Sequence, residues 1–360
     1  MANLHTTFLE YNRIMRLSDD KRNELIIARD GLRYRIEANF DAAKSGMNNE
    51  PERKSFIDEL LEFQSQGSYV MDTIINPIHG DYDLDDGIYL IGKRPRGQRP
   101  EPEELHRLVI QAIGADPKTI EKVIDKNTCV RVIFKAGFHI DLPIYYAGDK
   151  KCPDLADKKR GYTLSNPVEF IAWFEQKINS GFRTEFLYET KLYRNEYRQW
   201  LTDIRKQDHQ LRRIVRYLKS WGDLRREEMP CGLVMTILAA NHYAPRDRDD
   251  VSLMETLVNI HAALSKNFRC DRPTTPKGEN LLDEYKNKDA FMKYLKYFMD
   301  SAKAALQEND AKKACGYWQE RLGNRFPCHL VQSTNTNTSA NILSGLVSGA
   351  SSNRPWGKAM

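Results

Sequence analysis

The chain has 360 residues, 41% hydrophobic and 29% charged, which is typical of one large or two ordinary domains with real cores. No apolar run approaches the roughly 20 residues of a membrane span, and no signal-peptide pattern follows Met1, so we expect a cytoplasmic protein with no membrane partner. The net charge of +5 favours ligands that carry phosphate but is too small to indicate an obligatory nucleic-acid partner.

The six cysteines are scattered along the chain, and none of them forms a CxxC pair. This distribution argues against a zinc ribbon and against a disulfide framework. We therefore expect six reduced thiols, at Cys129, Cys152, Cys231, Cys270, Cys315 and Cys328.

The first half alternates between helix-like and strand-like segments. Apolar residues at helical spacing, with Ser18 as the N-cap, predict a long amphipathic helix over 18–45, and residues 56–64 read as a second helix or its end. Alternating patterns predict a strand over 82–92 and two strands over 129–146, joined at Ala136 and Gly137. A charged, Pro-rich loop and a helix separate these strands, so the first half reads as mixed α/β.

The second half is mostly helical. Five segments predict helices, over residues 167–178, 196–221, 232–243, 252–268 and 289–308. Residues 331–360 are rich in Ser, Thr, Asn and Gly and contain too little apolar surface to offset the cost of ordering. We therefore expect a core domain over 1–165, a helical domain over 166–330 and a disordered tail over 331–360.

Carboxylates interrupt two of the predicted strands. Because residues two apart project from one face of a strand, Asp83 and Asp85 point the same way, whereas Asp86 points to the opposite face and receives no metal role. A third acid, Asp141, lies in a similar apolar setting. Acids beside a packed sheet are costly unless they are paired or bound to a cation, and carboxylate oxygens suit Mg²⁺. Three such acids predict a two-metal site, although solvated acids on an edge strand are the alternative.

A Gly-Ser pair precedes these acids. Glycine lets backbone N–H groups approach phosphate oxygens, and the hydroxyl of Ser68 adds a donor or a metal contact. Gly67-Ser68 alone is a weak signal, as is a bare DxD. Their combination with a third strand-borne acid is far more specific, and it predicts a nucleotide site.

Four segments together resemble the bacterial CD-NTases, the cGAS/DncV-like nucleotidyltransferases of anti-phage signalling, within the polymerase-β-like superfamily. They are QGSYVMDT (66–73), GDYDLDDGIYL (80–90), FHIDLPIYY (138–146) and LRRIVRYLKSWGDLRREEMPCGLVMTILA (211–239). The resemblance runs from about residue 18 to residue 328. It implies an α+β fold in which a nucleotidyltransferase core with a mixed β-sheet is joined to a helical domain like that of oligoadenylate synthases, with the active site in the cleft between them.

The resemblance also implies roles for individual residues. Asp83, Asp85 and Asp141 match the catalytic, metal-binding acids, which hold two Mg²⁺ or Mn²⁺ ions. The phosphate-contacting turn matches Gln66, Gly67 and Ser68, and the triphosphate-binding lysine matches Lys219. Cys231 stands where a phosphate-binding serine is expected, and a thiol is a weaker donor.

The residues around Lys219 support its assignment. On a helix over 211–221, the apolar residues form one stripe and leave Arg212, Arg216 and Lys219 aligned on another face. A solvated basic face is the alternative interpretation. Pro230 near the start of the next helix favours an anion at that helix terminus.

The acids and the Gly-Ser turn predict metal-dependent nucleotidyl transfer. The resemblance implies more, a Mg²⁺-dependent enzyme that joins NTPs, ATP and GTP foremost, into a cyclic di- or trinucleotide second messenger for a downstream effector. Two alternatives stay open, a linear nucleotidyltransferase acting on an RNA end and a non-catalytic nucleotide-sensing protein. Some CD-NTase operons encode ubiquitin-like conjugation enzymes, and a flexible C-terminal tail is a suitable substrate for them.

Overall fold

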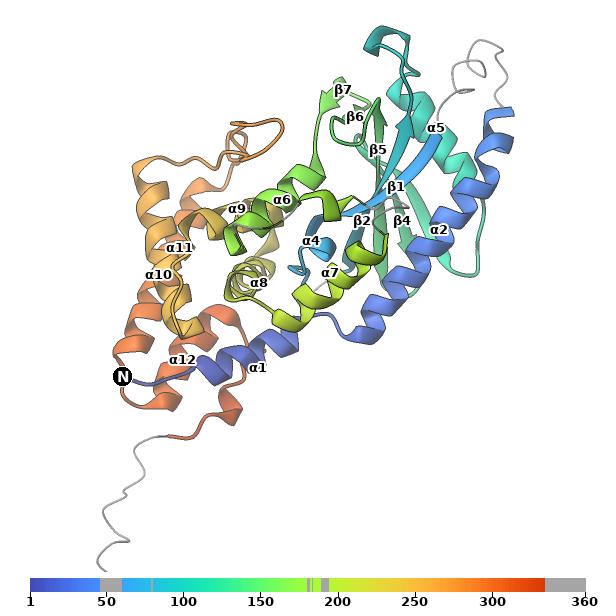
Figure 1. Ribbon diagram of the computed structural model, residues 1–360. Helices are drawn as coiled ribbons and strands as arrows, with labels where there is room; N and C mark the ends of the chain where they lie inside the picture. The colour runs from blue at the N-terminus through green and yellow to red at the C-terminus, as the bar shows by residue number, and fades with distance from the viewer. Residues whose placement is uncertain (46–59, 79, 180–181, 183, 189–193, 334–360) are drawn as a thin grey trace, which may run out of the picture.

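The computed structural model places a β-sheet with its covering helices beside a bundle of helices (Figure 1). It describes residues 1–45, 60–78, 80–179, 182, 184–188 and 194–333. The architecture is the α+β fold predicted from the sequence, with the sheet in the first half and the bundle in the second.

Within the described residues the sheet has seven strands, and its main path follows the order β1-β2-β5-β4-β3. The strands are β1 (Leu60–Gln66), β2 (Tyr82–Ile91), β3 (Ile120–Asp125), β4 (Cys129–Phe134), β5 (Phe138–Ala147), β6 (Asp154–Asp157) and β7 (Gly161–Leu164). β2 and β5 are parallel, and the other neighbouring pairs are antiparallel, so the sheet is mixed. β4 and β5 form the predicted hairpin.

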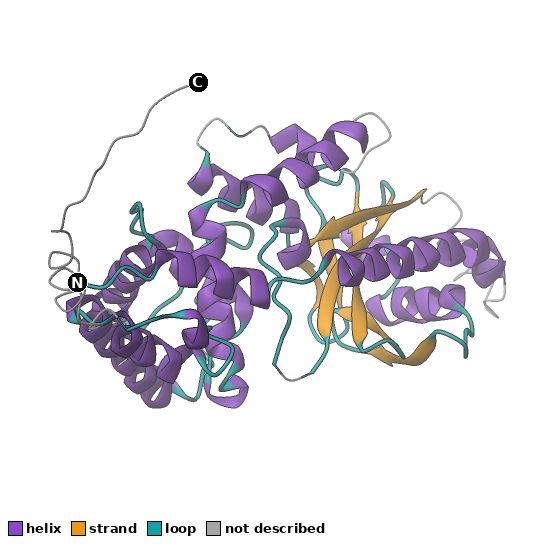
Figure 2. Ribbon diagram, turned by 90° about the horizontal axis from the view of Figure 1, so that it is seen from below, coloured by secondary structure: helices purple, strands orange, loops and turns teal. Residues whose placement is uncertain are grey.

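Two helices cover one face of this sheet (Figure 2). The long helix α2 (Asp19–Ser45) agrees with the predicted helix, and its buried face carries Leu25, Leu32 and Ile36. It packs against α5 (Pro102–Ile113), which begins with a capping box between Glu101 and Glu104. The opposite face of β2 is thereby left to the functional residues.

The prediction of helix over residues 56–64 is wrong for its described part. Residues 60–66 form β1, and residues 56–59 lie outside the described residues. Leu, Glu and Gln favour helices, but β1 pairs along its whole length with β2, and this tertiary pairing overrides the local preference.

The helical half consists mainly of α6 (Pro167–Ile178), α7 (Arg194–Gln207), α8 (Gln210–Asp223), α9 (Gly232–His242), α10 (Asp249–Lys266), α11 (Lys288–Gln307) and α12 (Ala311–Leu322). Short turns are α4 (Gly67–Val70), η1 (Arg96–Gln98), η2 (Thr184–Leu187), η3 (Arg226–Glu228) and η4 (Cys328–Leu330). The predicted helix over 196–221 is divided into α7 and α8. The break lies at Asp208, whose φ of +41° is in the left-handed region and cannot continue a helix.

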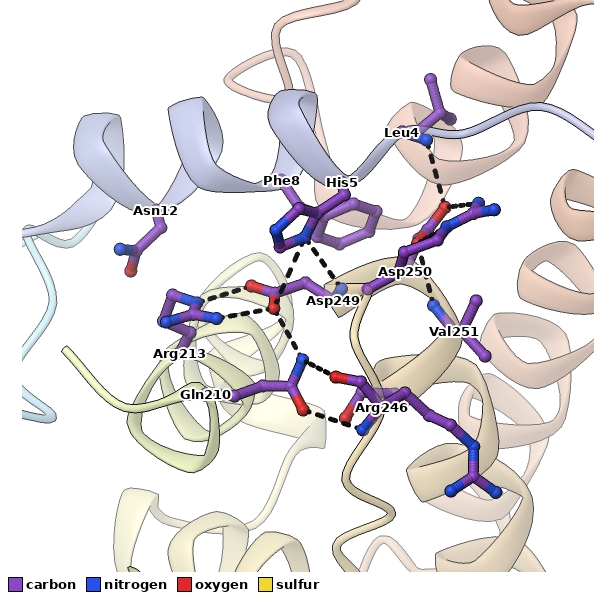
Figure 3. Close-up of polar contacts among 12 residues, drawn as sticks. Leu4, His5, Phe8, Asn12, Gln210, Arg213, Arg246, Asp249, Asp250 and Val251 are labelled. Carbon is purple, nitrogen blue, oxygen red and sulfur yellow. Dashed lines mark hydrogen bonds and ion pairs between the residues drawn. The ribbon is translucent and has the colours of Figure 1, made fainter.

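The first helix, α1 (His5–Met15), lies in the helical half, where it packs on α8 and α10. Figure 3 shows its anchors: the N–H of Leu4 donates to Asp250, and His5 contacts Asp249 at the start of α10. The predicted boundary at residues 165 and 166 falls between β7 and α6. Because α1 already packs on α8 and α10, the chain enters the helical half twice, first at α1 and again at α6.

The expectation of six reduced cysteines is wrong for one pair. Cys315 of α12 and Cys328 of η4 form a disulfide with a Cα–Cα distance of 5.6 Å. Their separation of 13 residues lacks a recognisable motif, but the chain reverses after Leu322 and brings the two thiols together. The other four cysteines are free.

The predicted tail falls largely outside the described residues, which end at residue 333. In the part of the chain that the structure covers, every helix is too short or too polar to cross a bilayer.

Candidate active site

The acids of β2 and β5 lie side by side because these strands are parallel neighbours. Asp85 is the register partner of Asp141, and Asp83 is the register partner of His139. Asp83 and Asp85 flank Leu84, which is 1% exposed, so both carboxylates lie on the face opposite to this buried side chain. Adjacent strands thus bring together the three acids singled out in the sequence.

The carboxylate of Asp86 points the other way. It is fully buried and accepts hydrogen bonds from Nε of Arg33, at 2.7 Å, and from Oγ of Ser65, at 3.0 Å. Arg33 belongs to α2, which covers the far face of the sheet. Asp86 therefore joins the helix to the sheet and is not part of the site.

A guanidinium group already contacts one of the acids. Arg131 on β4 donates from Nε and Nη2 to the two carboxylate oxygens of Asp141, each at 2.7 Å. This hydrogen bonding raises the pKa of Arg131. Arg131 was not predicted as a site residue, although a hairpin that turns at Ala136 and Gly137 pairs positions 131 and 141.

The surroundings of Asp85 disfavour the charged form of its carboxyl group. Burial raises the pKa of the Asp85 carboxyl well above its usual range, and the nearby charges of Asp83 and Asp141 raise it further. Lys219 and Arg131 oppose this rise in the pKa without reversing it. A carboxylate in this position gains stability when a cation binds beside it.

The donor set fits a hard divalent cation, because it consists of carboxylate oxygens on adjacent strands. Among the described residues, no three Asp, Glu, His or Cys side chains already converge into a metal-ligand cluster. Both oxygens of Asp141 accept from Arg131, so this acid is the one of the three that already has a cationic partner on a neighbouring strand.

The Gly-Ser turn lies directly against these acids. Gln66 ends β1 opposite Asp85, and Gly67 and Ser68 begin α4. Gly67 has a φ of +70°, and a Cβ added there would lie 2.1 Å from Oδ2 of Asp85. The position therefore needs glycine for its backbone conformation and for space. Nε2 of Gln66 donates to the hydroxyl of Tyr145 at 3.2 Å, so this side chain also supports the fold.

Lys219 approaches from the helical half. Its Nζ donates to the carbonyl oxygen of Thr73 at 3.2 Å and to Oγ1 of Thr73 at 3.3 Å. Burial lowers the pKa of Lys219 to about 8, although the charges of Asp83 and Asp85 favour its protonated form. The lysine is thus a partly buried cation within the field of the β2 acids.

Unlike Lys219, which is only partly buried, Arg212 and Arg216 are fully buried. Both are 0% exposed, so neither a solvated basic face nor a phosphate-binding face describes them. Arg212 forms a buried ion pair with Glu175 of α6 at 2.6 Å, and Arg216 pairs with Asp72 at 3.3 Å. Their packing partners lie far away in sequence, which is why helical periodicity could not reveal them.

Cys231 is the N-cap residue of α9 and is exposed. Pro230 precedes the cap rather than occupying the first turn. The next residue, Gly232, lies beside Lys219: a Cβ added to this glycine would be 3.4 Å from Cε of the lysine. The helix N-terminus and the lysine therefore face the same space, and both can attract an anion.

One cavity of about 800 Å³ connects these groups. The predicted residues that line it are Gln66, Gly67, Ser68, Asp83, Asp85, Lys219 and Cys231. Asp141 does not line it, but its partner Arg131 does. The loop between α10 and α11 adds Arg272 and Thr274, for which the sequence carried no signal. Both halves of the protein thus contribute to one polar cavity.

Comparison with known families matches a nucleotidyltransferase domain to the part of the chain that carries the acids and the Gly-Ser turn. Residues 61–145 match the family model described as "Cyclic GMP-AMP synthase DncV-like, nucleotidyltransferase domain". A c-di-GMP synthase of Roseivirga ehrenbergii is 23% identical over 309 residues, covering 80% of this chain and 77% of that protein. A cyclic GMP-AMP synthase of Escherichia coli is 26% identical over 198 residues, covering 48% of this chain and 44% of that protein.

The fold is also that of a solved enzyme. The Vibrio cholerae DncV cyclic AMP-GMP synthase, in complex with the linear intermediate 5′ pppA(3′,5′)pG, superposes with a TM-score of 0.69 at 18% identity. The match covers 92% of this chain and 99% of that chain. The 3′-deoxy GTP bound form of the same enzyme gives a TM-score of 0.70 at 17% identity, with 93% and 99% coverage.

Proposed function

Because the chain is a bacterial CD-NTase of the DncV-like group, we propose that it joins ribonucleoside triphosphates into a cyclic oligonucleotide second messenger and releases pyrophosphate. ATP and GTP are the proposed substrates, and the product is a cyclic di- or trinucleotide. The observation that carries this proposal is the register of Asp85 with Asp141, beside Asp83 and against the Gly67-Ser68 turn.

In this proposal the three acids hold two divalent cations, Mg²⁺ or Mn²⁺. When bound, the cations would supply the positive charge that lowers the pKa of the attacking ribose hydroxyl and neutralises the departing pyrophosphate. Asp85 and Asp141 would hold one cation, and Asp83 would help to hold the other. The raised pKa of Asp85 supports this assignment, because burial and then the charges of Asp83 and Asp141 disfavour its carboxylate form, and a cation beside it would offset both effects.

The residues around the acids bind and orient the triphosphate. Gly67 lets the turn lie against Asp85, and the backbone and hydroxyl of Ser68 provide donors for phosphate oxygens. Lys219 balances the remaining negative charge, and the start of α9 at Cys231 lies on the same side of the cavity. The cavity volume of about 800 Å³ is near the upper end of the range for small-molecule sites, roughly 300–1,000 Å³, which suits two nucleotides.

The test is incubation of the full chain with all four NTPs and Mg²⁺ or Mn²⁺, followed by mass spectrometry of the products. We expect a cyclic product whose mass lacks a terminal phosphate, with pyrophosphate released for each bond formed. A linear product that keeps its triphosphate supports the RNA-end alternative. Absence of metal-dependent pyrophosphate release supports the non-catalytic alternative and contradicts the proposal.

The biological role is a further part of the proposal. The product would activate a downstream effector in anti-phage signalling, and the C-terminal tail would be joined to a target by ubiquitin-like conjugation enzymes. Deletion of residues 340–360 tests the second point. We expect basal synthesis to remain nearly intact while any conjugate formed with the operon's own enzymes is lost. Outright loss of synthesis would contradict this role of the tail.

A further inference from the structure

The three residues that follow α4 are connected back to the Gly-Ser turn. The N–H of Met71 donates to the carbonyl of Gly67 at 3.2 Å, and the N–H of Thr73 donates to the carbonyl of Ser68 at 2.9 Å. Met71 is 3% exposed, and Asp72 and Thr73 are 0% exposed. Buried carbonyls need partners, so the carbonyl groups of this segment have to be satisfied from the other side.

The partners come from a single basic stripe on α8. Its three side chains donate to three consecutive carbonyl oxygens, in the same order along both segments: Arg212 to Met71 at 2.6 Å, Arg216 to Asp72, and Lys219 to Thr73 at 3.2 Å. We call this set of contacts the carbonyl ladder. It joins the turn proposed to contact phosphate to the helix that carries Lys219, the lysine proposed to bind the triphosphate.

The two arginines are fixed by further contacts, whereas the lysine is not. Arg212 donates to Glu175 with both terminal nitrogens, at 2.9 Å and 2.6 Å. Arg216 also donates to Asn12 at 2.9 Å and to the carboxylates of Asp72 and Asp208. For Lys219 only the two oxygen atoms of Thr73 serve as hydrogen-bond acceptors within the described part of the chain. The lysine end of the ladder is therefore free to exchange partners.

We propose that Arg212 and Arg216 are positioning residues that place Lys219 relative to the Gly67-Ser68 turn. They act through the rigid segment 71–73, whose N–H groups set the turn and whose carbonyl groups set α8. This inference rests on the proposed function, because it assigns the arginines a role in holding the triphosphate of a bound NTP. Neither arginine lines the cavity, so neither is a catalytic residue.

If Arg216 only stabilised the fold, its loss would lower the unfolding temperature without weakening nucleotide binding. Arg213, on the same helix, offers a matched control because it also pairs with a buried carboxylate. It donates to Asp249 from Nε at 2.7 Å and from Nη2 at 2.8 Å, on the side of α8 that faces α1 and α10 (Figure 3). Arg213 donates to none of the three ladder carbonyls, and its further bond is to the backbone carbonyl of Asp208, not to the Asp208 carboxylate that accepts from Arg216. R213M therefore tests the general cost of losing a buried ion pair.

The experiment is a double-mutant cycle on the full chain, with R216M, K219A and their combination, and with R213M as the control. Affinity for α,β-methylene-ATP with Mg²⁺ is measured by calorimetry, and thermal unfolding is followed for every variant. Asp72 keeps ion pairs to Arg16 at 3.0 Å and to Arg22 at 2.7 Å, so R216M leaves no uncompensated carboxylate there. We expect K219A to weaken binding by ~10-fold, the scale of a charge-assisted hydrogen bond.

The positioning role predicts that R216M also weakens binding severalfold and that the double variant binds no worse than K219A. Such non-additivity arises because Arg216 acts through Lys219. In turnover assays the same variants should raise KM with little change in kcat, since the triphosphate contact is made before and during the reaction. R213M should bind the analogue as the wild type does, even if it unfolds at a lower temperature.

Three outcomes overturn the proposal. Unchanged affinity in R216M, or a loss in the double variant equal to the product of the single losses, removes the role of Arg216 while leaving the enzymatic function intact. Failure of the wild type to make any product from the four NTPs overturns the function and this inference together.

R216K provides a second variant in case R216M does not fold. A lysine keeps a charge near Asp72 and Asp208, but one ammonium group cannot reproduce the planar fork that joins these residues to Asn12. We expect R216K to unfold near the wild-type temperature and to bind the analogue severalfold more weakly. Wild-type affinity in folded R216K contradicts the positioning role.

Discussion

Gly67 and Asp85 occupy adjoining space, so closely that a Cβ on Gly67 would lie 2.1 Å from Oδ2 of Asp85 and 3.1 Å from its carboxyl carbon. The carboxylate belongs to β2, and its own movement is limited by the parallel pairing with β5. The close approach therefore places the turn predicted to bind phosphate directly against an acid predicted to bind a cation. A change at either residue must alter both.

The first prediction is that G67A lowers the rate of synthesis by ~100-fold. An added methyl group has to push the Asp85 carboxylate away, and displacement of a reacting group by about 1 Å can cost ~100-fold in rate. G137A is the matched control, because Gly137 also has a positive φ, +82°, but nothing lies within 4 Å of its Cβ position. Both variants should lose stability on the order of 1–2 kcal/mol from the left-handed backbone. Equal activity losses in the two variants would show that strain alone explains the result.

The second prediction concerns the acids of β2. The double variant D83N/D85N should fold but lose turnover by ~10³-fold or more, because in the proposed mechanism these two acids hold the cations that stabilise the transition state. Pyrophosphate release with Mg²⁺ measures this loss. The neighbouring D86N variant is the control: it should lose about 1–3 kcal/mol of stability, because it loses charged hydrogen bonds to Arg33, while each folded molecule stays active.

The same double variant predicts a pH dependence of stability. The pKa of Asp85 is raised in the folded protein, so its contribution to stability is full below the ordinary carboxyl pKa and is lost as the pH rises through the folded value. In EDTA, D83N/D85N should therefore melt at a higher temperature than the wild type near pH 7, and the difference should shrink toward pH 4. Saturating Mg²⁺ should stabilise only the wild type. A difference in melting temperature that stays the same across this pH range would contradict the raised pKa of Asp85.

The sequence was informative where a regular element has a fixed period. Alternation along β2 placed Asp83 and Asp85 on one face and Asp86 on the other, and helical spacing identified the buried face of α2. The Asp141 partner Arg131 was also within reach, because a hairpin turn fixes which positions face each other. These features depend on local geometry, which neighbouring residues determine.

Features that depend on distant contacts were not predictable in the same way. The helical pattern placed Arg212 and Arg216 on one face but contained no information about the irregular segment that covers it, about 140 residues earlier in the chain. β1 contains good helix formers and becomes a strand through pairing with β2. The disulfide between Cys315 and Cys328 likewise requires the chain reversal after α12.

The third prediction concerns Cys231 at the start of α9. A hydroxyl donates a stronger hydrogen bond than a thiol, so C231S should increase affinity for α,β-methylene-ATP by ~2- to 5-fold. Maleimide should inactivate the wild type and spare C231S, and bound nucleotide should slow the reaction. C152S is the control, because Cys152 is also free and exposed but does not line the cavity. Protection in C152S, or none in C231S, would place the sensitive thiol elsewhere.

The fourth prediction follows from the pKa of Lys219, which burial lowers to about 8. Only the protonated amine attracts a triphosphate, so nucleotide affinity in the wild type should fall as the pH rises through about 8. A bound triphosphate favours the protonated form, and binding at pH 8.5 should therefore take up a proton. Calorimetry in buffers of different ionisation enthalpy measures this uptake directly.

K219R separates this titration from every other pH effect at the site. A guanidinium group stays charged across the whole range, so the variant should bind with an affinity that is flat between pH 7.5 and 9.5 and without proton uptake. K296R, at an exposed lysine paired with Asp300 on α11, should keep the wild-type profile. The same decline of affinity in K219R would assign the titration to another group. Proton uptake confined to chains that retain Lys219 would identify this lysine as the cation that meets the triphosphate.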